Sequence, residues 1–245
     1  MNTRTEPREG FTLIELLPVL MIIGIQAAIF FPGVQGVMRS NQKSASMNKL
    51  RVIGQGYMNW SLGTKTMTRS GNWTPDGRVA TKVSEYAANL ATDPALNSGE
   101  LWFVEGDALL ERYSPTAKPQ NVLLGLGSGA SIDPLFIDSI REATGTSWTV
   151  YADTSISVAG NALVPLAWTR GLETSGLWAP ADGTVNGSVW GTEGGHIVYG
   201  DGHVSWCSDT LVTGSDYFTD RNGAPTANWL QSRGIPATAK ALPQQ

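Results

Sequence analysis

The chain of 245 residues has few of the side chains on which most catalytic and metal-binding sites depend, with one cysteine, Cys207, and two histidines, His196 and His203. A single cysteine cannot form a disulfide within the chain, so the folded part must be stabilised by packing or by a bound ion. The sequence also lacks a Ser-His-Asp order, a phosphate-binding Walker loop and a paired-carboxylate site. We therefore expect that the protein is not an enzyme.

Charged residues are also scarce, at 16% of the chain, and none occurs from Leu16 to Met38. This uncharged run reaches the length of about 20 residues that a helix needs to cross the hydrocarbon core of a bilayer. One acid, Glu15, lies near the start of the run, where a buried charge costs about 2.5 to 3.5 kcal/mol on insertion scales unless it has a partner. The sequence thus predicts a membrane helix that begins with a functional acid.

Glu15 belongs to the octet Gly-Phe-Thr-Leu-Ile-Glu-Leu-Leu of residues 10–17, which follows a short polar leader. The leader lacks the long apolar core and the small-residue cleavage pattern of an ordinary secretory signal. The octet and the run behind it, up to about Gly56, resemble the N-terminal segment of type IV prepilins and type II secretion pseudopilins. This resemblance implies that a prepilin peptidase removes residues 1–10 by cutting after Gly10 and methylates the new N-terminus, Phe11.

The resemblance also implies a role for Glu15. No partner for its carboxylate is evident within a single subunit, where a desolvated carboxylate favours its neutral form. In the prepilin family the partner is the positively charged amine of a neighbouring subunit, which here is the amine of Phe11. Cleavage of the leader and assembly would thereby be coupled.

On this resemblance the protein is a structural subunit, a pilin or pseudopilin, of a type IV pilus-like filament that polymerises through its N-terminal helix. Its partners would be other copies of itself, the prepilin peptidase, the assembly platform of a pilus or of type II secretion, and membrane lipid before assembly. The implied location is the inner membrane, with a single helix as the anchor and the head outside the cytoplasm. The assembled form would be an extracellular or periplasmic filament.

The formal charges divide along the chain. Between Leu16 and Pro75 all six are positive, whereas residues 76–245 carry nine basic and eighteen acidic side chains. Basic residues just beyond a membrane span favour a cytoplasmic flank, while the prepilin resemblance implies the opposite orientation. We follow the resemblance, because the leader also carries Arg4 and Arg8 and because a basic stalk would contact acidic neighbours in an assembly. No nucleic-acid partner is expected, since the basic residues lie on the stalk.

The N-terminal helix is predicted over residues 11–62, because the pattern becomes amphipathic after Met38 and Gly63 supplies a stop. Its second half must then pack on a head domain, residues 63–245.

Several residues interrupt the apolar run of this helix. Gly24 and Pro32 mark the stretch where we expect the helix to melt in a filament, because an interior proline removes one backbone hydrogen bond. Pro18 stands where the family has aliphatic residues, and nothing in the sequence explains it.

The head is rich in turns and loops, as the 28 glycines and 13 prolines of the chain indicate. Its periodic segments predict helices at 83–90, 108–113 and 134–143, and strands at 148–152, 162–169 and 188–190. The last stretch, residues 234–245, is expected to be a frayed tail. The predicted fold class is α+β, with a long N-terminal membrane-spanning and stalk helix packed on an antiparallel β-sheet head.

A second signature lies at residues 196–206, where Asp201-Gly202 between alternating apolar residues predicts a hairpin with a two-residue turn. The face expected in the core carries the pairs Tyr199 with Val204 and Ile197 with Trp206. The other face carries His203 and the pairs Val198 with Ser205 and His196 with Cys207. The residues of this face could form a His-Cys metal site. We favour a structural role, because the sequence spacing places no carboxylate beside the histidines.

The hairpin, together with residues 165–172 before it, resembles the C-terminal part of pilin-like proteins from planctomycetes and verrucomicrobia. Those heads often end in Gly-Gly, an apolar strand, Asp-Gly-His-Val and an aromatic residue. A histidine commonly stands ten residues before their Asp-Gly pair, but that position here is Gly191. This departure indicates that such a histidine is not required for the fold.

Two further parts of the head could bind a ligand. Asp216, Asp220 and Asn222 form an oxygen-rich loop near the C-terminus, where major pseudopilins often bind calcium, and their oxygens suit a hard cation. The loop lacks the spacing and the terminal Glu of an EF-hand, so a solvated turn is the alternative.

Eight of the nine tryptophans follow residue 62. They form either the core, which we favour, or a sugar-stacking surface. The second option makes the rival function a membrane-anchored, Trp-rich glycan-binding module that forms no filament.

Overall fold

A computed structural model describes residues 12–64, 72–75, 79–113, 119–125, 127–137, 148–152, 164–184, 186–211, 218–233, 235 and 240–242. The chain divides into two compact units, Met1–Lys43 and Ser44–Gln245. A long N-terminal helix and small antiparallel sheets make up the described structure, so the fold class is α+β as predicted.

The N-terminal helix, α1, runs without interruption over Leu13–Thr64 and ends two residues beyond the predicted position. It is long and apolar enough to cross a membrane. Its apolar side chains in the first unit are exposed, and Ile29 and Phe30, for example, are 70% and 69% accessible. The backbone of Gly24 and of Pro32 is helical. The predicted break at these residues concerns an assembled filament and therefore remains a prediction.

The other helices and strands belong to the second unit and are short. The helices are α2 Val83–Leu90 and α3 Ala108–Tyr113, with 3-10 turns at η1 Pro94–Leu96, η2 Gly99–Trp102, η3 Gly127–Gly129, η4 Gly191–Glu193 and η5 Trp229–Gln231. The strands are β1 Leu123–Leu124, β2 Ser131–Ile132, β3 Trp148–Ala152, β4 Pro165–Thr169, β5 Gly195–Tyr199, β6 Val204–Cys207, β7 Phe218–Thr219, β8 Pro225–Thr226 and β9 Lys240–Ala241. They form one antiparallel sheet in the order β6-β5-β4-β3-β9 and two separate pairs, β1-β2 and β7-β8.

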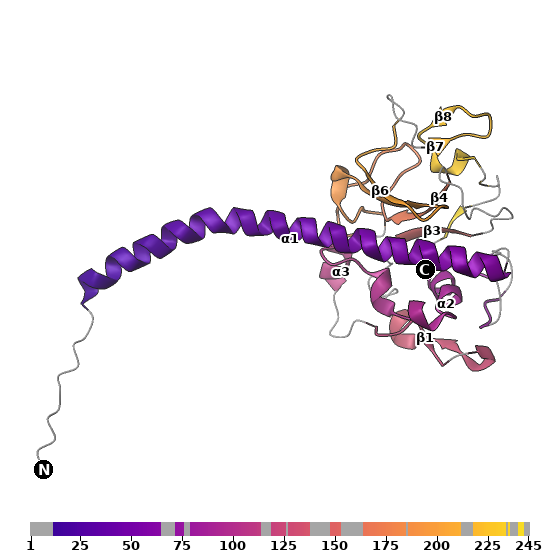
Figure 1. Cartoon of the computed structure of the whole chain (residues 1–245), viewed down its shortest axis with the longest axis horizontal. Helices are drawn as coiled ribbons and strands as arrows, with labels where there is room; N and C mark the ends of the chain where they lie inside the picture. The colour runs from indigo at the N-terminus through magenta and orange to yellow at the C-terminus, as the bar shows by residue number, and fades with distance from the viewer. Residues whose placement is uncertain are drawn as a thin grey trace, which may run out of the picture. The chain divides into compact units, whose positions relative to one another are not determined.

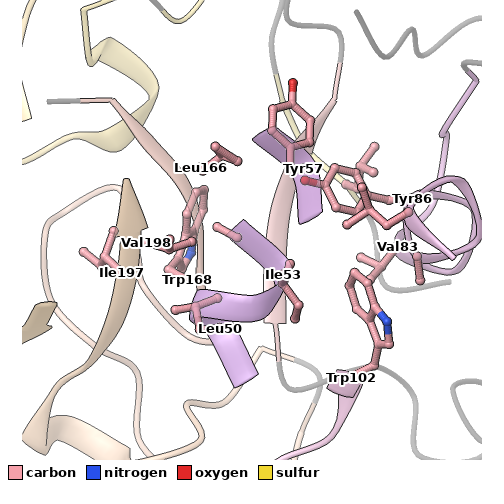
Figure 2. Close-up of a cluster of buried hydrophobic side chains, with 14 of the residues drawn as sticks. Leu50, Ile53, Tyr57, Val83, Tyr86, Trp102, Leu166, Trp168, Ile197 and Val198 are labelled. Atoms are coloured by element: carbon pink, nitrogen blue, oxygen red, sulfur yellow. The ribbon is translucent and has the colours of Figure 1, made fainter. Parts of the chain in front are cut away.

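The part of α1 that belongs to the second unit lies at the centre of the core. Figure 1 shows it between the five-stranded sheet on one side and α2 with β1 on the other. Ile53 and Tyr57 are almost fully buried. Towards the sheet, Gly54 lies so close to β5 that an added Cβ would be 2.5 Å from Cγ2 of Val198. On the opposite side the Tyr57 ring stacks on Tyr86 of α2, with ring centroids 5.9 Å apart (Figure 2).

Most of the predicted elements of the head are confirmed. α2, α3 and β3 have the predicted bounds. Of the helix predicted at 134–143, residues 134–137 are helical and the rest lie outside the described residues. β4 begins at Pro165, and residues 162 and 163 of the predicted strand are likewise outside the described residues.

Two predictions about the head are wrong. Residues 188–190 are not a strand, because Ser188 packs against the backbone of Gly171 and donates its N–H to the carbonyl of Pro180 instead of joining a ladder. The C-terminal stretch is not simply a frayed tail, since β9 pairs with β3 and the neighbouring Leu242 is buried. Pairing with β9 covers what would otherwise be an open edge of the sheet at β3.

A buried ion pair joins Asp107, the residue before α3, to Arg170, the residue after β4. Both oxygens of Asp107 accept hydrogen bonds from the Arg170 guanidinium, at 2.7 and 3.0 Å, and the two side chains are 0% and 4% exposed. The Nε of Arg170 also donates to the carbonyl of Gly187, at 2.9 Å. Because removal of one partner from such a pair costs about 3 to 5 kcal/mol, this contact fixes the loop that precedes β5.

The tryptophans of the head mostly belong to the core. The buried ones are Trp102, Trp168, Trp178, Trp190 and Trp229. The half-buried ones are Trp60, Trp73 and Trp206, and the side chain of Trp148 is outside the described part of the chain. The interpretation of the tryptophans as core residues is therefore confirmed for those that the structure describes.

The substitution Gly54→Ala tests the position of α1 in the core. Alanine is favoured over glycine in a helix by about 1 kcal/mol, but its Cβ would collide with the buried Val198, and overpacking costs about 1 to 3 kcal/mol. We expect a lower free energy of unfolding, measured by chemical denaturation in detergent. Gly63→Ala is the matched control, because nothing lies within 4 Å of its added Cβ, and it should not destabilise. Equal effects of the two substitutions would contradict the described packing.

Candidate functional site

The first turn of α1 contains Glu15, the acid that the sequence singles out. Thr12 precedes the helix and Glu15 lies three residues further on, which is the spacing of an N-terminal capping box. The backbone N–H and the hydroxyl of Thr12 donate to Oε2 of Glu15 at 3.0 and 2.7 Å. The N–H of Glu15 in turn donates to the carbonyl of Thr12 at 3.1 Å. Glu15 therefore closes the first turn of the helix on which it lies.

This contact corrects one expectation from the sequence. We expected Glu15 to have no partner within a single subunit, and that is wrong because Thr12 supplies two hydrogen-bond donors. The Thr-x-x-Glu spacing was the signal that reveals this partner. The surroundings of the carboxylate are apolar and exposed, as the side chains of Leu13 and Leu17 illustrate. The site is thus a hydrogen-bonded carboxylate on an exposed apolar helix.

The N-terminal segment also contains the predicted processing site and the predicted helix break. Gly10 and Phe11, the predicted processing residues, lie outside the described residues. Gly24 lies on open helix surface, with nothing within 4 Å of an added Cβ. The side chain of Pro32 is not among those described. The processing site and the helix break consequently remain predictions.

The hairpin of β5 and β6 is present, but its predicted register is wrong by one residue. The N–H of Tyr199 donates to the carbonyl of His203 at 3.0 Å, and Val198 lies opposite Val204. The turn has three residues instead of the predicted two. Its third residue, Gly202, has a φ of +86° and forms a bulge at the end of the turn. All five residues of β5 are buried, so both faces of this strand belong to the core.

The turn brings an acid, a histidine and a tyrosine together. The rings of Tyr199 and His203 stack, with centroids 4.3 Å apart and planes at 7°. Oδ1 of Asp201 accepts the backbone N–H of His203 at 3.0 Å and lies 2.5 Å from Nδ1 of its ring. Partial burial raises the pKa of Asp201, but the hydrogen bonds from His203 and the charge of its ring outweigh this and hold the pKa below its ordinary value. These contacts fix the exposed ring of His203.

His196 and Cys207 have different surroundings. His196 is buried, and its Nδ1 lies 3.1 Å from the hydroxyl oxygen of Ser46 on α1. Burial raises the pKa of the Cys207 thiol, and hydrogen bonds with Ser205 and Tyr199 offset this only in part. The two histidines thus make separate contacts. Among the residues that the structure describes, no three His, Cys, Asp or Glu side chains come together to hold a metal ion.

The candidate calcium loop is described in part. Asp216 lies outside the described residues. Oδ1 of Asp220 accepts the backbone N–H groups of Asn222 and Ala224, each at 2.8 Å, so this oxygen already stabilises the turn between β7 and β8. The remaining oxygens of Asp220 and Asn222 are chemically suited to calcium, and calcium binding stays a prediction.

The substitution Asp201→Asn tests the contact between Asp201 and His203. Asparagine keeps an oxygen acceptor but removes the charge, and we expect unfolding to become easier at neutral pH by less than about 1 kcal/mol because the pair is partly exposed. A carboxyl with a lowered pKa stabilises the folded state above its ordinary pKa and loses this effect as the pH falls through the folded pKa. We expect the free energies of unfolding of the two forms to differ at about pH 7 and to become equal as the pH falls to about 2. Chemical denaturation of both forms across this range measures the difference. A difference that does not change with pH would contradict this account.

Comparisons of the chain with protein-family models, with curated proteins and with solved structures found no match. The geometry of the chain itself must therefore support any functional argument. The features available for it are the exposed apolar helix, the hydrogen-bonded Glu15 at its start and the head that encloses its second part.

Proposed function

We propose that this chain is a structural subunit, a pilin or pseudopilin, of a type IV pilus-like filament, held in a membrane before assembly and polymerised through α1. The observation that carries the proposal is the exposed apolar part of α1, which begins with Glu15 and contains no charge from Leu16 to Met38. A contiguous apolar surface of this size marks a membrane or protein interaction site. Lipid would cover it in the single subunit, and helices of other copies would cover it in the filament.

The head supports the same proposal. The second part of α1 packs on an antiparallel sheet, which is the arrangement expected of a pilin-like fold. The tryptophans whose side chains are described are buried or half-buried. In the described part of the head they offer no exposed aromatic platform, so no observation favours the glycan-binding alternative.

Glu15 provides a mechanism for adding subunits one at a time. Both of its hydrogen bonds from Thr12 end on Oε2. Within the described residues this leaves Oε1 available, and a cationic amine forms a stronger hydrogen bond with a carboxylate than a neutral donor does. We assign that donor to the methylated amine of Phe11 in a neighbouring copy. The amine exists only after the leader has been cut, so assembly would follow processing.

The first test of this proposal is the N-terminus of the mature chain. We expect it to begin at Phe11 with a methylated amine, because the octet at residues 10–17 matches the prepilin processing site. Mass spectrometry of the N-terminal peptide from assembled material measures this directly. The substitution Gly10→Val should leave uncut precursor in the membrane. Assembled material that retains Met1 would refute the processing step.

The second test is the substitution Glu15→Leu. The variant should be cut and inserted at least as well as the wild type, because the apolar segment loses its one acid. It should assemble poorly, since the amine of Phe11 would be buried without its partner, and breaking a buried charge pair costs about 3 to 5 kcal/mol. Filament yield and N-terminal mass spectrometry measure the two effects separately.

Two controls make this result specific. Glu173→Leu removes an exposed carboxylate from the head and should assemble normally. Thr12→Val removes the hydroxyl donor but keeps the carboxylate, so it should weaken the first turn of α1 and still assemble. Wild-type filament yield from Glu15→Leu would show that the carboxylate is an interfacial acid with no role in assembly.

A further inference from the structure

The turn between β5 and β6 holds the ring of His203 in one orientation. The ring stacks on Tyr199, which is itself buried, with ring centroids 4.3 Å apart. Its Nδ1 lies 2.5 Å from Oδ1 of Asp201. The turn packs on α1, since an added Cβ on Gly202 would be 2.7 Å from Cε of Met58. The imidazole is therefore positioned by the fold of the chain before any ligand arrives.

This orientation decides which nitrogen of the ring can bind a ligand. Asp201 is ionised at neutral pH and can only accept a hydrogen bond, so the proton of the neutral imidazole lies on Nδ1. The other nitrogen, Nε2, then carries the lone pair. No group in the described part of the chain bonds to Nε2, and 47% of the side chain is exposed. Metal-binding histidines are held in this way, with one nitrogen bonded to a carboxylate and the other directed at the ion.

The ion that suits Nε2 is a divalent transition metal of the zinc class. Neutral imidazole binds zinc, copper and nickel, whereas magnesium and calcium prefer oxygen ligands. A role as a catalytic base is less suitable, because such a base needs a nucleophile within hydrogen-bond reach. The hydroxyl of Ser205, two residues along the chain, lies 3.6 Å from Sγ of Cys207 instead. The geometry of the turn therefore favours metal binding over catalysis.

One chain does not complete the coordination of such an ion. Zinc takes about four ligands, and among the residues that the structure describes no three His, Cys, Asp or Glu side chains come together. His196, the other histidine, is buried beside Ser46. A second protein ligand must therefore come from another molecule.

We infer that Nε2 of His203 binds a divalent transition metal ion, and that a second copy of this chain binds the same ion through its own His203. Each copy gives the same residue, so the contact closes a dimer about a twofold axis. Charge favours a cation at this contact, because residues 76–245 carry nine basic and eighteen acidic side chains. Two such heads repel each other, and a divalent cation between them lowers the repulsion. Water can fill the remaining positions on the ion.

This inference goes beyond the proposed filament and does not depend on it. Neighbouring subunits of a helical filament make head-to-tail contacts, in which two different surfaces meet. A twofold contact through one residue does not continue into a filament of that kind. The metal-bridged pair is therefore a form of the chain outside the filament.

Zinc titration of the full-length protein in detergent tests this inference. The protein is treated with EDTA, which is then removed, and zinc chloride is added while size-exclusion chromatography with light scattering measures the mass. We expect zinc to convert monomers into dimers and EDTA to reverse this. Magnesium chloride at the same concentration should leave the protein monomeric. Cys207 is buried and is not available to zinc.

Three variants assign the site, and thermal unfolding in detergent should show that each remains folded. His203→Gln should lose the zinc-dependent dimer. Combining it with Ser128→His moves the imidazole to the exposed turn η3, and this variant should also stay monomeric because the new imidazole lacks Asp201 and Tyr199. Asp201→Asn keeps the imidazole but loses the charge behind it, and it should need about ten-fold more zinc to form the dimer.

Two results would overturn the inference. One is a wild type that stays monomeric at every zinc concentration at which it is soluble. The other is a His203→Gln variant that forms the dimer as readily as the wild type, which would place the zinc elsewhere. Neither result depends on filament formation, so failure here would leave the filament proposal intact.

Discussion

The structure depends on the burial of the second part of α1 between a β-sheet and a helical layer. Leu50 and Ile53 lie in the same apolar cluster as Val198 from the sheet and Tyr86 from α2 (Figure 2). Without this helix both layers would expose their apolar faces to water, at a cost of roughly 25 cal/mol for each Å². The head is therefore completed by a helix that the same chain continues towards its N-terminus. A protein built in this way cannot release the helix and keep a folded head.

Contacts with the β5–β6 hairpin fix the helix within the head as well. Ser46 contacts the buried His196 near one end of the enclosed part, and near the other end Gly202 of the hairpin turn lies against Met58. Rotation of the helix would break these contacts and would push Gly54 away from β5. These contacts thereby fix which face of the helix is buried. This rigidity is what a filament requires if each head is to be positioned by contacts made through helices.

The sequence predicted those features that depend on neighbouring residues. The apolar run after Glu15, the periodicity of α2 and the Asp-Gly turn are all local patterns, and each was found. Features that depend on distant residues were missed. Ser46 and His196 are 150 positions apart, and β9 is a strand of two residues that exists only because β3 offers it an edge. The hairpin register was missed for a subtler reason, since a glycine with positive φ suits a two-residue or a three-residue turn equally well.

Electron microscopy of material sheared from the surface or membranes of producing cells tests whether this chain forms a filament through α1. We expect filaments that contain the chain, with α1 of many copies packed in the centre and the heads outside. We also expect that a reconstruction will place Glu15 of one copy beside Phe11 of another. Dispersed membrane monomers that bind glycans, with no filament under any condition of expression, would contradict the account.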